Sequence, residues 1–175
     1  MKIDRMKLRN PYVRGSVMAI LALALGARSA GAAALLDQKV LPLSLATEAA
    51  QAAVAACRQK GFHISAAVTD QDGLMRALLR DDGAGPHTLD SSVKKAYTAA
   101  SLGVSTGVLT KILVEHPDAT GLRDMNNRIL IMQGGLPIKA GAEVIAGIGV
   151  GGTPGGDTDE ACARAGLEKI MDRLS

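Results

Sequence analysis

Apolar and polar positions along the first half of the chain follow two different periods. Between residues 44 and 60, small apolar residues recur with helical spacing, which predicts a helix that Gly61 ends. Residues 62–69 (FHISAAVT) alternate in polarity and are rich in β-formers, and residues 74–80 (LMRALLR) continue that character after an Asp-Gln-Asp-Gly turn sequence. We therefore expect a helix followed by a β-hairpin.

The second half of the chain predicts two further helices, a second hairpin and a last helix. Asp90 is a candidate cap for a helix that closes at Gly103, and Ser105 can cap the next one. The remaining segments are a helix over 106–115, an irregular stretch over 118–128, a strand over 129–132, a turn over 134–137, a strand over 143–150 and a helix over 157–174 with a capping-box pair, Asp157 and Glu160. This order favours an α+β fold in a single domain, with a central antiparallel sheet of about five strands flanked by helices.

The N-terminus has the three parts of a secretory signal peptide. A basic segment precedes an uncharged apolar run over residues 16–27, and small residues then offer A-x-A cleavage sites near 32–34. The run is shorter than the ~20 residues that a membrane-spanning helix requires, and the alternatives to a signal peptide are an uncleaved anchor and an ordinary amphipathic helix. We expect a signal peptide over 1–32, a linker over 33–42 and one domain over 43–175, located in the periplasm or secreted.

Removal of the signal peptide changes the charge of the protein. The whole chain has 20 basic and 17 acidic residues and a pI near 9.0, but residues 1–32 hold six of the basic residues and one of the acidic ones. The mature domain therefore has a net charge of about −2. It has no cluster of Lys and Arg, and its only aromatic residues are Phe62 and Tyr97, so we expect no nucleic-acid partner.

Cys57 and Cys162 are the two cysteines of the chain. Export would allow them to form a disulfide. Both fall on predicted helices, however, and free cysteines are commonly buried as small apolar residues, so the pattern favours two unpaired thiols. Their spacing cannot decide between the two outcomes, because separation along the chain does not establish proximity.

The sequence contains no motif that identifies a catalytic centre. The stretch 147–152 (GIGVGG) superficially resembles a dinucleotide-binding loop, but it lies within and after a strand that no parallel partner follows, which favours close packing against a helix. His63 and His116 have ordinary interpretations, on a strand surface and at a helix end. His87 lies on a predicted loop, where functional residues concentrate, with a plain surface histidine as the alternative.

Several blocks of the sequence, taken in order, resemble the GlcG/HbpS-like family of small heme-binding proteins, and its exported, HbpS-like branch most of all. The blocks are VTDQDG (68–73), RDDGAGP (80–86), KAYTAA (95–100), GGLPI (134–138), AGIGVGG (146–152) and GDTDEA (156–161). The resemblance covers about residues 43–172. It implies an antiparallel sheet with a profilin- or PAS-like layout, assembly into homo-oligomers and, in at least some members, heme binding.

The resemblance also implies candidate heme contacts. A threonine proposed as an iron contact in the secreted branch maps to Thr106, with Thr98 as the alternative, whereas other members use histidine. Heme iron is ordinarily held by His, Met, Cys or Tyr, so His87 is the preferred axial candidate. Other candidates are Tyr97, to stack or ligate, and Arg80, Lys94 and Lys95, to pair with propionates; core packing and ordinary surface charge are their alternatives. The sequence has no CxxCH motif, so any heme is held non-covalently.

Three functions are compatible with these observations. The first is an exported heme-binding protein without enzymatic activity, acting as a carrier, a scavenger or a sensor accessory. The second is an enzyme that acts on a small acidic metabolite and needs Asp72, Arg80 and Lys95 in one cleft. The third is a structural oligomeric module that presents a surface to a membrane sensor protein, and its signature would be a large apolar face between subunits and no enclosed pocket.

Overall fold

Four antiparallel strands form a sheet in the order β2-β1-β4-β3. The computed structural model describes residues 34–174, so the predicted signal peptide lies outside the described residues. The residues from 38 onward make up one unit with an α+β fold. The strands are β1 (Ser65–Asp70), β2 (Met75–Arg80), β3 (Gly135–Ala140) and β4 (Glu143–Gly151). The helices are α2 (Leu43–Gln59), α3 (His87–Leu102), α4 (Thr106–Glu115) and α5 (Gly156–Glu168), with short 3-10 helices η2 (Pro117–Arg123) and η3 (Met171–Arg173).

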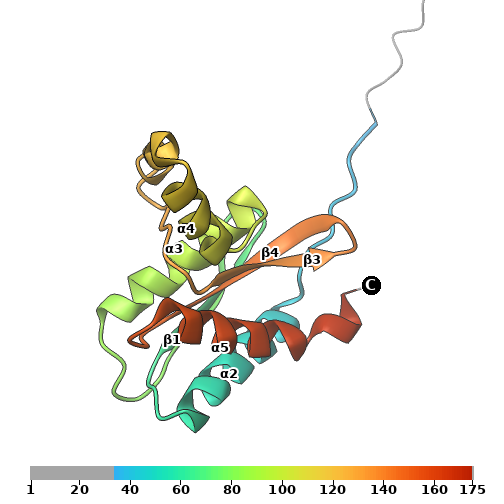
Figure 1. Ribbon diagram of the computed structural model, residues 1–175. Coiled ribbons are helices and arrows are strands. Elements are labelled where there is room, and N and C mark those ends of the chain that lie inside the picture. Colours follow the sequence, from blue (N-terminus) through green and yellow to red (C-terminus); the bar gives the residue numbers. More distant parts are fainter. Residues whose placement is uncertain (1–33, 175) are drawn as a thin grey trace, which may run out of the picture. The chain divides into compact units, whose positions relative to one another are not determined.

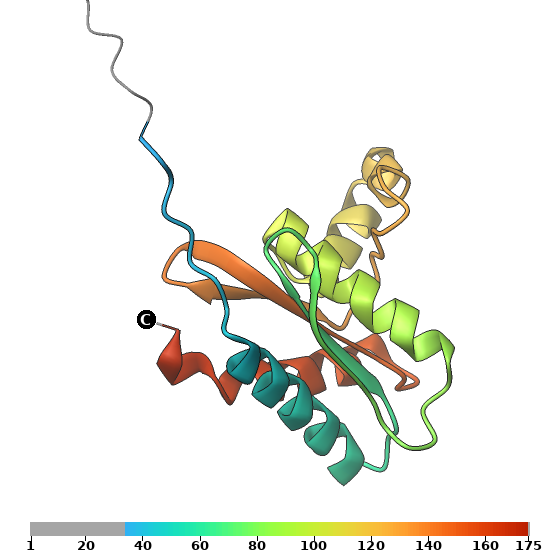
Figure 2. The ribbon, with the colours of Figure 1, turned by 180° about the vertical axis from the view of Figure 1, so that it is seen from behind.

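Helices cover both faces of the sheet. α2 and α5 lie side by side on one face (Figure 1), and α3 lies on the other, as the view from behind also shows (Figure 2). The main apolar core lies between the sheet and the α2–α5 pair. Alternate strand residues such as Val68, Ile148 and Val150 meet a layer of helix alanines there, so small and β-branched side chains fill a core that has almost no aromatic residues.

The opposite face of the sheet is lined with glycine and small residues, which lets α3 approach very closely. A Cβ atom at Gly147 would overlap the carbonyl oxygen of Ala96, and one at Gly149 would overlap that of Ser92. The stretch 147–152 is therefore a packing surface for α3, as predicted, and not a dinucleotide-binding loop.

α4 and η2 extend from the α3 side of the molecule and enclose a second, smaller apolar cluster (Figure 1). Leu109 and Leu113 of α4 pack in this cluster with Ile129 and Ile131. The predicted strand over 129–132 is therefore wrong, because its two isoleucines are buried against α4 instead of joining the sheet.

The third strand lies a few residues after its predicted position. β3 occupies residues 135–140, where the pattern predicts a turn, and it pairs with β4 at the edge of the sheet. Pro137 is tolerated there because an edge strand has one side without a pairing partner. The described sheet has four strands and not about five: residues 129–132 do not join it, and β3 pairs with β4 in their place.

The capping signals of two helix ends are confirmed. Gly103 ends α3 in the left-handed conformation, with a φ of 69°. The Ser105 side chain caps α4 by accepting a hydrogen bond of 3.1 Å from the Val108 amide.

Two other predicted helix caps are wrong. α3 begins at His87 and not at Asp90, because Pro86 already has a helical backbone, with φ −62° and ψ −32°. His87 is therefore the first residue of a helix and not part of a loop. α5 begins at Gly156 without the predicted capping box and ends at Glu168. Among the described helices, none is by itself long and apolar enough to cross a membrane, and only the bent pair α3 and α4 meets those criteria together.

Cys57 of α2 and Cys162 of α5 form a disulfide bond, with their Cα atoms 5.5 Å apart. Both residues are buried on helices, but the expectation of unpaired thiols is wrong. The pairing follows from the close approach of the two helices near Gly166, where a Cβ atom would nearly overlap the carbonyl oxygen of Ala49.

Candidate functional site

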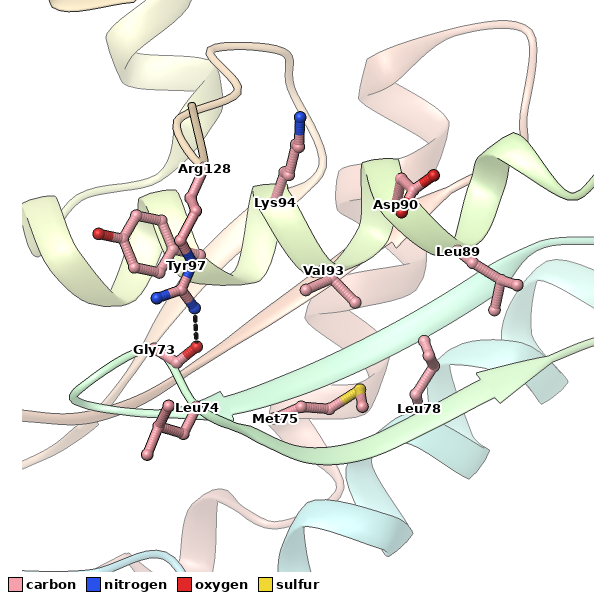
Figure 3. A pocket seen from close by; sticks show the side chains of 10 residues that line it. All are labelled: Gly73, Leu74, Met75, Leu78, Leu89, Asp90, Val93, Lys94, Tyr97 and Arg128. Atoms are coloured by element: carbon pink, nitrogen blue, oxygen red, sulfur yellow. Dashed lines mark hydrogen bonds between the residues drawn. The ribbon is translucent and has the colours of Figure 1, made fainter. Parts of the chain in front are cut away.

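Two clefts of about 450 Å³ each flank α3, and both have the size of ordinary ligand sites. The first cleft lies between β2 and α3 (Figure 3) and is lined by Gly73, Leu74, Met75, Leu78, Leu89, Asp90, Val93, Lys94, Tyr97 and Arg128. The second cleft lies between the first turns of α3, the loop before β3 and the end of β4. It is lined by His87, Asp90, Ser91, Lys94, Lys95, Leu130, Met132, Gly151, Gly152, Thr153 and Asp159.

Apolar side chains form the walls of the first cleft. Leu78 of β2 faces Leu89 and Val93 of α3 across the opening (Figure 3). Leu74 and Met75 extend the strand side, and they are 61% and 57% exposed. A row of large apolar side chains left open beside a cleft is typical of a surface that an apolar ligand covers.

Gly73, Tyr97 and Arg128 close one end of the first cleft. The guanidinium carbon of Arg128 lies 3.9 Å from the centroid of the Tyr97 ring, and its Nη2 donates a hydrogen bond to the Gly73 carbonyl (Figure 3). The Tyr97 hydroxyl accepts a hydrogen bond of 3.2 Å from the Asn126 side-chain amide. Gly73 has a φ of 75°, and a Cβ atom there would overlap the tyrosine ring, so glycine is required at this turn.

A buried ion pair lies beside the second cleft. The Lys95 Nζ atom donates to Asp159 Oδ2 at 2.7 Å and to the Val150 carbonyl at 2.9 Å, and the lysine side chain is 1% exposed. The other carboxylate oxygen of Asp159 accepts a hydrogen bond of 3.1 Å from the Thr153 amide. These hydrogen bonds tie α3 to β4 and α5. Because Asp159 already balances its charge, Lys95 is not a free cation for a ligand.

Two possible metal-binding side chains line the second cleft. His87 is exposed at the start of α3, and its ring lies against Gly85, where a Cβ atom would come within 2.7 Å of Cε1. Met132 is 52% exposed in the loop before β3. Imidazole and thioether groups are both known ligands of heme iron.

Three of the candidates from the sequence lie outside both clefts. Thr98 accepts a hydrogen bond of 2.8 Å from the Leu130 amide, and Thr106 accepts one of 2.8 Å from the Gly135 amide. Both threonines are fully buried, so they anchor the loop before β3 and the start of that strand. The Arg80 Nε atom donates to the Ala84 carbonyl at 2.8 Å.

The three residues of the enzyme hypothesis do not converge. Asp72 lies in the turn before β2, Arg80 ends that strand, and Lys95 is a buried residue of α3. Neither Asp72 nor Arg80 lines a cleft with Lys95, so the structure does not form this predicted site. Within residues 34–174, no three His, Cys, Asp or Glu side chains converge to hold a metal ion.

His63 belongs to a separate ion-pair cluster around Asp81. Its Nδ1 lies 3.2 Å from Asp81 Oδ2, and Arg58 of α2 also donates to this buried carboxylate. The hydrogen bond from Arg58, assisted by that from His63, lowers the pKa of Asp81 to about 2, although burial opposes the shift. The cluster joins the end of α2 to the loop after β2, which gives His63 a structural role.

The structure thus distributes the predicted residues over two sites. His87 and Lys95 line the second cleft, and Tyr97 lines the first. The sequence interpretation missed Met75, Arg128 and Met132. Met75 lies in a strand pattern that resembles any half-buried strand, and the loops that carry Arg128 and Met132 have no periodicity that could indicate where they fold.

Residues 41–168 of the chain match the family described as "Haem degrading protein HbpS-like". Among curated proteins, an uncharacterized 15.0 kDa protein from the dhaT-dhaS intergenic region of Citrobacter freundii is 33% identical over 113 residues. That match covers 64% of this chain and 80% of the Citrobacter protein.

Solved structures share this fold. A double mutant of Streptomyces reticuli HbpS is 44% identical and superposes with a TM-score of 0.72, covering 77% of this chain and 89% of that one. A PduOC:heme complex superposes with a TM-score of 0.69 at 21% identity, covering 75% and 96% of the two chains. At that identity the likeness shows only the fold.

Proposed function

The chain belongs to the HbpS-like family, and from this premise we propose that it is a heme-binding protein that holds the macrocycle in the first cleft. The family match over residues 41–168 and the 44% identity to HbpS support a heme-related function. A protein of the same fold has been solved in complex with heme. The observation that carries the placement is the row of open apolar side chains along the cleft, foremost Leu74 and Met75.

The residues of the first cleft fit a porphyrin. Its apolar walls suit the faces of the ring, and the Arg128 guanidinium at the closed end suits a propionate. Met75 and Tyr97 belong to the residue types that hold heme iron. Bound heme would supply the redox and ligand-binding chemistry of its iron. The sequence has no CxxCH motif, so the proposal is for non-covalent binding.

A second placement puts the macrocycle in the second cleft. His87, the axial candidate favoured by the usual chemistry of heme ligands, is then the axial ligand, and Met132 is a further ligand candidate. Lys94 is the available cation there, since Lys95 is paired with Asp159. The second cleft has a more polar lining than the first. We prefer the first cleft for the heme because the faces of the porphyrin ring are apolar.

The proposed setting is outside the cytoplasm, with the protein acting as a heme carrier, scavenger or sensor accessory. The signal-peptide sequence supports export, and so does the buried disulfide, because such bonds persist in oxidising compartments. The resemblance to the family, which implies homo-oligomers, extends the proposal to self-association and to a membrane sensor as partner. The family description also supports heme degradation as a second candidate activity.

A hemin titration with matched variants tests the proposal. We expect a saturable Soret shift at one heme per chain. Met75→Glu should weaken it at least about tenfold, because it puts a charge into the apolar wall. Met125→Glu is the control, since Met125 is equally exposed at 57% but lines neither cleft. His87→Ala should leave the shift unchanged.

The outcomes separate the placements and the activities. Loss of the shift in His87→Ala but not in Met75→Glu moves the heme to the second cleft. A stable Soret band under reductant and oxygen indicates a carrier, whereas its decay with release of iron indicates degradation. No saturable shift in the wild-type protein overturns heme binding.

A further inference from the structure

The closed end of the first cleft combines an apolar groove with a fixed cation. We propose that this cleft recognises a tetrapyrrole by its ring and its carboxylates and not by its iron, so that it also binds metal-free porphyrins. This inference rests on the proposed function and specifies the ligand class of the same site.

The cleft offers little to an iron atom. Among the ten residues that line it, only Met75 and Tyr97 are of a type that ordinarily holds heme iron. The Tyr97 hydroxyl already accepts a hydrogen bond from Asn126, and Arg128 covers a face of its ring. The turn at Gly73 packs against the edge of the same ring. Tyr97 is therefore held as a wall of the cleft, which leaves the thioether of Met75 as the one candidate without such contacts.

Arg128 is placed to bind a carboxylate of the ligand. Stacking on Tyr97 and the hydrogen bond to the Gly73 carbonyl hold its guanidinium at the end of the cleft. A guanidinium has five N–H donors in a planar fork, and in the described structure Nη2 alone is used, so the others are available to a ligand. Lys94 and Asp90 leave α3 on the side away from the strands, whereas the Arg128 guanidinium lies between Tyr97 and the turn at Gly73 (Figure 3).

These features together define an amphiphilic ligand. Leu78, Leu89 and Val93 suit the faces of a flat apolar ring, and Arg128 suits an acidic group at one edge. A porphyrin with propionate side chains has this distribution of apolar and charged groups whether or not it carries a metal. Binding should then depend on the carboxylates and only weakly on the iron.

The test compares three ligands on the purified wild-type protein: hemin, metal-free protoporphyrin IX and hemin dimethyl ester, in the same low concentration of detergent. Absorbance reports the two hemins, and porphyrin fluorescence reports the metal-free ring. We expect protoporphyrin IX to bind within about tenfold of hemin. The dimethyl ester should bind at least about tenfold more weakly, because it lacks the charge that Arg128 pairs with.

Variants assign the carboxylate effect to Arg128. Arg128→Met should weaken hemin and protoporphyrin IX equally, by about tenfold, and leave the dimethyl ester unchanged. Arg123→Met is the matched control, an exposed arginine of η2 that lines neither cleft. The ligand comparison on the wild-type protein needs no variant, so it decides the question even where Arg128→Met does not fold.

The outcomes also separate this inference from the proposed function. If hemin binds and protoporphyrin IX does not, the protein recognises the iron. The inference is then overturned, while heme binding stands. If the dimethyl ester binds as tightly as hemin, the role of Arg128 is overturned. If neither hemin nor protoporphyrin IX binds, the proposed function itself fails.

Discussion

The Lys95 ammonium lies 2.7 Å from the Asp159 carboxylate, and both side chains are buried where α3 and α5 meet the sheet. The two residues are 64 positions apart, and each makes a further hydrogen bond to the backbone, Lys95 to Val150 and Asp159 to Thr153. A buried pair of this kind costs desolvation and is stable only while both partners are present.

Replacing one partner of this pair should strongly destabilise the fold. Lys95→Met leaves the Asp159 carboxylate buried without its counter-charge, so we expect the free energy of unfolding to fall by about 3–5 kcal/mol. Chemical denaturation measures this. The double variant Lys95→Met, Asp159→Leu should recover much of the loss. Lys169→Ala removes an exposed, 4.0 Å pair with Glu48 and should cost less than about 0.5 kcal/mol. The prediction would be contradicted if Lys95→Met, the double variant and Lys169→Ala all lowered the free energy of unfolding by the same amount.

The glycines of β4 that contact α3, Gly147 and Gly149, should not tolerate even one added methyl group. Gly149→Ala places a Cβ atom into the backbone of α3 at Ser92 and Ala96, so we expect a loss of about 3 kcal/mol or a protein that does not fold. Gly121→Ala is the control, because a Cβ atom there has no neighbour within 4 Å. Thermal unfolding of both variants checks the prediction, which fails if Gly149→Ala unfolds at the wild-type temperature.

The disulfide should contribute substantially to stability. It closes a loop with a sequence separation of 105, for which chain entropy gives about 3–5 kcal/mol. Cys57→Ala, Cys162→Ala should therefore unfold at lower denaturant concentration than the oxidised wild-type protein. Reductant should lower the wild-type midpoint and leave that of the double variant unchanged. A wild-type midpoint that does not respond to full reduction would show that the bond stabilises nothing.

Acid should remove the contribution of Asp81. Its pKa is lowered from 3.8 to about 2 in the folded protein, mainly by the hydrogen bond from Arg58. A lowered pKa means that the ionised carboxylate stabilises the fold fully above about pH 4 and that this stability is lost as the pH falls through about 2. The difference in unfolding free energy between the wild-type protein and Asp81→Asn should shrink over that interval. A difference that stays constant from pH 5 to pH 2 argues against the role of this cluster.

Features that depend on residues a few positions apart could be predicted from the sequence. The hairpin of β1 and β2, the Ser105 cap of α4 and the Gly103 end of α3 all follow from local backbone preferences. The ordered sequence blocks indicated the family, and the family match supports that assignment. Local pattern could not show that residues 129–132 stay outside the sheet, because burial of Ile129 and Ile131 against α4 overrides their preference for strands.

Which side chains meet was decided only by the tertiary structure. Arg128 reaches Gly73 across 55 positions, and Cys57 reaches Cys162 across 105. These contacts depend on how α3 packs against the glycines of β4 and how α5 packs against α2. No local sequence pattern predicts either packing. The sequence by itself therefore determined most of the helices and strands, the family and a set of candidates that included His87 and Tyr97. The packing of α3 placed those two candidates in different clefts.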